Sequence, residues 1–161
     1  MLKKLKKIMV VAAAAVMLSA GFATVAPNET HAAHWADIQM KWAFKKGIVT
    51  ADLRDNLATR QDTWIMIARW QGRSPSNYDQ ARKFVVDWRI SDGTRGTDLV
   101  TRDEVVAMLY NRYMHNHISG WTPSGGFSNA RDWGVKFGIY DGSRGNAFAT
   151  RAEVVTMLFN I

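Results

Sequence analysis

The chain has 161 residues, which is enough for one domain with or without a targeting segment. Its 21 Lys and Arg against 14 Asp and Glu give a net charge of +7, so nucleic acid is the first class of partner to test. No cysteine is present, which excludes disulfides and thiolate chemistry.

The first 32 residues have the layout of a secretory signal peptide. A start with four lysines precedes the apolar run 8–20, and small residues follow at 30–33. We expect cleavage after Ala32 or Ala33; the alternative is an uncleaved membrane anchor, because mostly apolar residues continue to Ala26. Without this segment the remaining net charge is +4, and export argues against nucleic acid as the partner. The protein is expected to be secreted to the cell wall or cell surface, with no stable membrane span after cleavage.

Residues 33–161 contain three copies of one unit. The pattern T-R-x-[DE] recurs at 59–62, 101–104 and 150–153, with an isoleucine eleven residues before each threonine and a methionine seven residues after it. Several anchors at fixed spacing in three copies indicate an internal repeat. The predicted repeats span about 33–70, 78–112 and 127–161.

Each copy predicts a helix, a loop and a second helix. In copy one, an apolar stripe of Trp35, Ile38 and Trp42 has helical spacing, and Gly47 is a suitable helix end. The second helix begins at the T-R-x-[DE] threonine. One such pair cannot bury its own apolar face, so we predict an all-α fold in which three pairs share one core with approximate three-fold symmetry. Trp42 and its equivalents, Phe84 and Trp133, are expected in that core.

The threonine and the acidic residue of each motif predict a capping box, in which hydroxyl and carboxylate each accept a backbone N–H at the helix start. This assigns a structural role to Thr59 with Asp62, Thr101 with Glu104, and Thr150 with Glu153.

Capping does not require the motif arginine, and the helix dipole disfavours a cation in the first turn. Arg60, Arg102 and Arg151 therefore have another role: either their planar guanidinium groups bind a ligand carboxylate, or they form ion pairs between repeats. Arg95 and Arg144, in the D-G-[ST]-R-G turns, either line the rim of a groove or only face solvent.

Trp35 begins its helix in the segment His34-Trp35-Ala36. It is a candidate for stacking on a sugar face, and core packing is the alternative.

These motifs resemble the S-layer homology (SLH) repeat, which has an "HWA" start, a glycine–isoleucine pair at the helix end, and a closing "TRAE" segment. Copy three has Thr150-Arg151-Ala152-Glu153, and copy one has Gly47-Ile48. The loop before T-R is about five residues shorter than the common form. The resemblance implies a pseudo-three-fold SLH-like bundle whose grooves bind anionic secondary cell-wall polysaccharide, often through a pyruvylated sugar, with the motif arginines contacting the ligand. It also implies non-covalent attachment to a Gram-positive surface.

Other chemistries fit the sequence poorly. The turns at Asp92 and Asp141 lack the ligand pattern of a calcium loop, and His115 and His117 have no further histidines nearby for a metal site. Both glutamates after residue 32 are assigned as caps, so no pair of catalytic carboxylates remains for a hydrolase. We therefore expect no enzyme activity, no cofactor and no metal. The sequence predicts a non-catalytic wall-binding module; the alternative is an extracellular protein–protein interaction or inhibitor module on the same scaffold.

Overall fold

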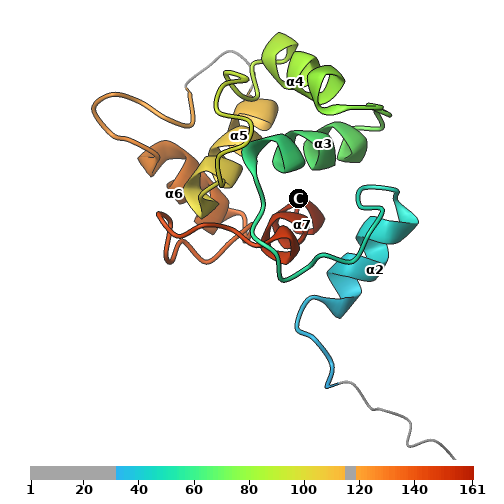
Figure 1. Ribbon diagram of the computed structural model, residues 1–161. Coiled ribbons are helices and arrows are strands. Elements are labelled where there is room, and N and C mark those ends of the chain that lie inside the picture. Colours follow the sequence, from blue (N-terminus) through green and yellow to red (C-terminus); the bar gives the residue numbers. More distant parts are fainter. Residues whose placement is uncertain (1–31, 115–118) are drawn as a thin grey trace, which may run out of the picture. The chain divides into compact units, whose positions relative to one another are not determined.

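The computed structural model describes residues 32–114 and 119–161 (Figure 1). The predicted signal peptide up to residue 31 lies outside the described residues, as do His115 and His117. Over the described ranges the chain is all-helical, with six helices and no strand. None of the described helices is long and apolar enough to cross a membrane.

The three sequence copies supply two helices each. The helices are α2 (Asp37–Lys45), α3 (Arg60–Trp70), α4 (Tyr78–Asp87), α5 (Arg102–Met114), α6 (Ser128–Lys136) and α7 (Arg151–Phe159).

The main helix pairs join different copies. Helix α4 of copy two packs on α3 of copy one, α6 of copy three packs on α5 of copy two, and α2 of copy one packs on α7 of copy three (Figure 1). Helix α7 also contacts α3 and α5. Copy three therefore supplies the packing partner for the first helix of copy one.

The repeated anchor residues form the core. Ile48, Ile90 and Ile139 are at most 2% exposed, and the repeated methionines are buried with them. The three aromatic residues expected in the core, Trp42 and its equivalents, are only partly buried and pack against its outside.

The predicted apolar stripe of α2 is wrong for Trp35 and Ile38, whereas its third residue, Trp42, packs against the core. Trp35 is 60% exposed and Ile38 is 70% exposed, while Ala36, Met40 and Ala43 face the core. Helix α2 therefore packs on α7 through the face that carries Ala36, Met40 and Ala43. Of the predicted stripe, Trp42 takes part in that contact, with its ring 5.3 Å from the ring of Phe159 in α7.

A ring of backbone hydrogen bonds joins the segments that precede the second helices. The N–H of Ala58 donates to Ala149 O (2.9 Å), that of Ala149 donates to Val100 O (2.9 Å), and that of Val100 donates to Ala58 O (3.0 Å). All three residues are fully buried. The ring joins copy one to copy three, three to two, and two back to one.

The residue two positions later in each copy continues this pattern. The N–H of Arg60 donates to Asp98 O, that of Arg102 to Ala147 O, and that of Arg151 to Asn56 O. These bonds satisfy N–H groups that the start of a helix leaves without intrahelical acceptors. The loop of one copy thus holds the second helix of the preceding copy, and each helix start is placed beside a neighbouring loop.

Candidate functional site: three grooves between copies

Capping boxes fix the start of each second helix. In copy one, the Asp62 N–H donates to Thr59 Oγ1 (3.2 Å) and the Thr59 N–H donates to Asp62 Oδ2 (3.0 Å). Thr101 with Glu104, and Thr150 with Glu153, make the same reciprocal bonds. One carboxylate oxygen of each acidic residue is thereby held by the backbone.

The other carboxylate oxygen accepts the motif arginine of the preceding copy. Arg60 Nη1 lies 2.8 Å from Glu104 Oε1, Arg102 Nη1 lies 2.5 Å from Glu153 Oε1, and Arg151 Nη1 lies 3.1 Å from Asp62 Oδ1. The pairs close a circle, since copy three pairs with copy one.

Burial of the motif arginines differs around this circle. The side chains of Arg60 and Arg102 are only 6% and 7% exposed, whereas that of Arg151 is 17% exposed. The structure therefore places the motif arginines in the ion pairs between repeats that the sequence left as one alternative.

The turn arginines approach the same carboxylates from outside. Arg95 Nη2 donates to Glu104 Oε1 (2.8 Å), and Arg144 Nη2 donates to Glu153 Oε1 (3.3 Å). Their side chains are 55% and 67% exposed. In the two turns with this motif, each glutamate thus lies between a buried and an exposed guanidinium group.

Both turn arginines have a left-handed backbone, with φ of 56° at Arg95 and 49° at Arg144. A residue with a side chain in this region costs about 1 kcal/mol relative to glycine. The turns therefore hold exposed arginines where glycine would be more stable.

Aspartates at the start of these turns complete the arrangement. Asp92 Oδ1 lies 2.8 Å from Arg60 Nη2, and Asp141 Oδ1 lies 2.8 Å from Arg102 Nη2. Hydrogen bonds from the Ser143 N–H and hydroxyl lower the pKa of Asp141, and burial opposes them. Burial raises the pKa of Asp92, but the bonds from Thr94 and Arg60 outweigh it and the net shift is downward. Both carboxylates are ionised at neutral pH.

Three grooves lie where these groups meet, and each is named here after its motif arginine. The Arg102 groove encloses about 590 Å³, and the Arg60 and Arg151 grooves enclose about 380 Å³ each. Equivalent residues of the copies line them. The Arg102 groove contains Ile139, Asp141, Arg144, Glu153, Met157 and Asn160; the Arg60 groove contains Ile90, Asp92, Arg95, Glu104, Met108 and Asn111.

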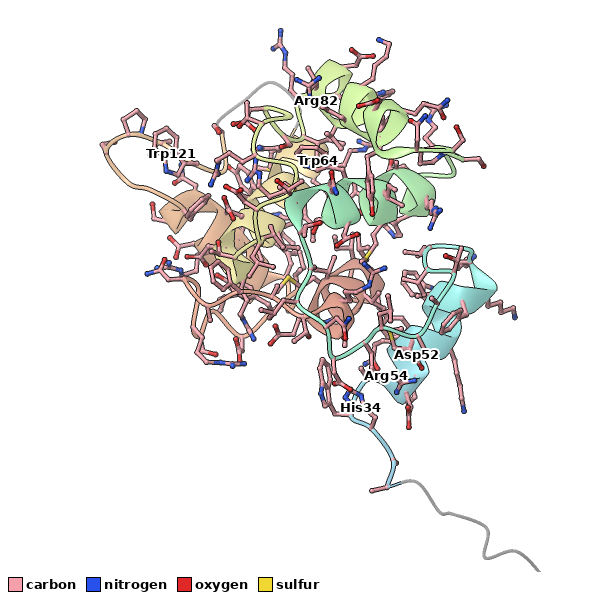
Figure 2. All side chains as sticks on the ribbon, in the orientation of Figure 1. His34, Asp52, Arg54, Trp64, Arg82 and Trp121 are labelled. Atoms are coloured by element: carbon pink, nitrogen blue, oxygen red, sulfur yellow. The ribbon has the colours of Figure 1, made fainter. Side chains whose placement is uncertain are left out.

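An exposed aromatic residue stands at the rim of each groove. Trp35 lines the Arg102 groove and is 60% exposed; Trp121 lines the Arg60 groove and is 51% exposed. Tyr78 lines the Arg151 groove, where its hydroxyl donates to Asp62 Oδ1 (3.2 Å). Trp121, which lies on the connector before α6 (Figure 2), is not among the site residues predicted from the sequence. The sequence signal for Trp121 as a site residue is its position in a glycine-rich connector.

The Arg151 groove has a different lining. Thr50 and Leu53 line it where the other copies have the turn aspartate and arginine. The nearby Arg54 pairs instead with Asp52 and Asp37 of its own copy, beside His34 (Figure 2). This groove thus lacks the exposed turn arginine of the other two, and its second guanidinium group is that of Arg69, which donates to Ile48 O (3.3 Å).

The described residues contain no group of three or more His, Asp or Glu side chains that could hold a metal ion. The grooves offer guanidinium groups, carboxylates and exposed indole rings, which suit hydrogen bonding and stacking. Comparison of the sequence with protein-family models and with curated proteins gives no match.

Proposed function

We propose that this protein is a secreted, non-catalytic module that binds anionic secondary cell-wall polysaccharide on a Gram-positive surface. The scaffold would be a pseudo-three-fold bundle of three SLH-like repeats. The resemblance of the T-R-x-[DE] motifs supports this scaffold, as do the backbone and ion-pair circles that use equivalent residues of the three copies.

The observation that carries the proposal is the pair of exposed, left-handed arginines at the groove rims. Arg95 and Arg144 occupy conformations that favour glycine, and each lies in a groove beside an exposed tryptophan. Strained residues of this kind are concentrated at functional sites. A guanidinium group binds a carboxylate through two hydrogen bonds, and an indole ring packs on the apolar face of a sugar.

The motif arginines and the turn arginines differ in role because they differ in burial. The buried Arg60 and Arg102 hold the glutamates and shape the groove. Arg144 makes a long, exposed ion pair of 3.3 Å, which contributes little to stability and is readily exchanged for a ligand carboxylate. Arg95 is also exposed, but it makes a shorter ion pair of 2.8 Å with Glu104 in its groove.

Sedimentation with purified Gram-positive walls tests the proposal. We expect the wild-type protein to pellet with intact walls, to be displaced by soluble wall polysaccharide, and to bind more weakly as salt rises. The double variant Arg95→Gly with Arg144→Gly should remain in the supernatant.

Arg89→Gly is the matched control, because Arg89 also has a left-handed backbone (φ 54°) but lines none of the three grooves. Binding to walls stripped of the secondary polysaccharide would contradict the proposal. Capture of an extracellular protein without any wall material would favour the alternative, a protein-interaction module.

A further inference from the structure

We infer that the ends of four helices form a second binding surface, separate from the grooves, which rests on an anionic lipid bilayer. The surface is a row of six aromatic residues, called here the aromatic strip: Trp70, Phe84, Trp88, Tyr113, Trp133 and Phe137. None of the six lines the Arg60, Arg102 or Arg151 groove. The inference therefore goes beyond the proposed function and depends on different residues.

The aromatic strip lies where helices end. Trp70 is the last residue of α3, and Tyr113 lies in the last turn of α5. Trp88 follows α4 directly, and Phe137 follows α6. Motif arginines begin α3 and α5, so the strip lies at the opposite ends of those two helices from the motif arginines.

Ring contacts join the ends of α3, α5 and α6. The ring centre of Tyr113 lies 6.2 Å from that of Trp70 and 5.8 Å from that of Trp133. The Trp133 ring in turn lies 6.0 Å from the Phe137 ring. Tyr113 is 49% exposed and Phe137 is 60% exposed, so this part of the strip faces solvent.

The end of α4 continues the row. Phe84 and Trp88 have ring centres 6.0 Å apart, and Trp88 is 39% exposed. The guanidinium carbon of Arg112 lies 5.2 Å from the centre of the Trp88 ring, and Arg112 directly precedes Tyr113 in α5. Exposed aromatic residues from four helices thus form one patch, and patches of this kind mark interaction surfaces.

The patch is strongly basic. Cationic groups lie 5.2–5.8 Å from three ring centres: Arg73 at Phe84, Arg112 at Trp88, and Lys136 at Phe137. The helix ends at 67–73, 84–90, 110–114 and 133–137 together contain five Lys or Arg and one Asp, a net charge of +4. That equals the net charge of all residues from 33 to 161. Helix dipoles favour basic residues at these ends, but they do not account for the aromatic residues exposed beside them. A negatively charged surface is complementary to this patch.

Ring geometry favours lipid over a sugar chain as the occupant. Neighbouring rings of the strip are tilted by 39–52° to one another, so they offer no common plane on which successive sugars could stack. A bilayer interface makes no such demand: Trp and Tyr rings are enriched there at the level of the headgroups, and Lys and Arg extend to the phosphates. The aromatic strip has this composition.

Co-sedimentation with lipid vesicles tests the inference. The purified exported protein, with loss of the signal peptide checked by mass, is mixed with vesicles of phosphatidylglycerol and phosphatidylcholine, or of phosphatidylcholine alone. We expect binding to the anionic vesicles that weakens as salt rises, and little binding to the neutral ones. Tryptophan emission should shift to shorter wavelength on binding, since three of the six strip residues are tryptophans.

Two pairs of variants assign the contact to the strip. Phe137→Ser should weaken vesicle binding about tenfold, because an exposed apolar ring is lost from the contact. Phe148→Ser is its matched control, since Phe148 is 50% exposed but lies outside the strip. Lys136→Gln should weaken binding about fivefold, and Lys41→Gln, on the exposed side of α2, should have a much smaller effect.

Groove variants separate this inference from the proposed function. Arg95→Gly with Arg144→Gly should lose wall binding and keep vesicle binding, whereas Phe137→Ser should do the reverse. Absence of wild-type binding to the anionic vesicles, or equal losses for Phe137→Ser and Phe148→Ser, would overturn this inference and leave the proposed function in place. Loss of wall binding or of a captured protein in Phe137→Ser, with vesicle binding unchanged, would also overturn it. Absence of wall binding by a wild-type protein that binds vesicles would overturn the proposed function alone.

Discussion

Replacing Arg102 by alanine tests whether the ion pairs between copies stabilise the fold. Arg102 is buried, bonds Glu153 and Asp141, and lies with its guanidinium carbon 5.8 Å from the centre of the Tyr140 ring. Loss of one partner of a buried ion pair costs about 3–5 kcal/mol, because the other charge stays buried without compensation.

The lower end of this range applies to Arg102→Ala. Glu153 keeps its bonds from the Thr150 N–H and from Arg144, and removal of Arg102 also removes an unsatisfied Nε. We therefore expect a loss of about 3 kcal/mol in the free energy of unfolding. Arg144→Ala, which removes an exposed bond to the same glutamate oxygen, should cost about 0.5 kcal/mol or less.

The expected loss in unfolding free energy differs among the three motif arginines. Arg60→Ala should cost about 1 kcal/mol more than Arg102→Ala, because it also breaks the bond from Nε to Thr94 O. Arg151→Ala should cost least of the three, because Arg151 and Asp62 are both 17% exposed. Urea unfolding at neutral pH, followed by tryptophan fluorescence and with comparable m-values, measures all four variants. A loss below about 1 kcal/mol for Arg102→Ala would refute the reasoning.

Three further predictions concern caps, packing and pH. Thr150→Ala should lower the unfolding free energy by about 1 kcal/mol through loss of the N-cap, with Thr150→Ser as the control in the same urea titration. Gly120→Ala should lower the melting temperature, because the new Cβ would lie 2.9 Å from Ala107 Cα; an unchanged value in calorimetry would contradict this packing. The pKa values of Asp62, Asp92 and Asp141 lie below the ordinary 3.8, so these carboxylates add stability above about pH 4 and lose it as pH falls through their lowered pKa values. Stability measured from pH 6 to pH 2 should therefore fall in acid, and Asp141→Asn should flatten part of that fall.

The capping bonds, the helical class and the repeated core residues could be predicted from the sequence. The T-x-x-[DE] pattern predicts the reciprocal capping bonds, because those bonds involve only residues three apart. The all-α class follows from helical periodicity and from the glycine at helix ends, and Gly47 and Gly138 do have left-handed backbones. The repeated isoleucines and methionines identify the core because a buried position recurs at the same place in every copy.

Features that depend on contacts between distant residues could not be predicted in this way. The stripe through Trp35 and Ile38 suggested the wrong face of α2, since the buried face is set by α7, more than a hundred residues away in the sequence. The role of each arginine depends on which copy it meets and on its burial. Asp141 and Thr156 join Arg102 only because the loop and second helix of copy three pack against the helix start of copy two.

The ring formed by Ala58, Val100 and Ala149 has a consequence for the order of events during folding. Its closing hydrogen bonds need Ala149, which lies near the end of the chain, and α2 needs α7 as its packing partner. Contacts of such long sequence separation form late, since the entropy of closing a large loop must be overcome first. A chain synthesised from its N-terminus therefore cannot complete this fold until its third copy is available.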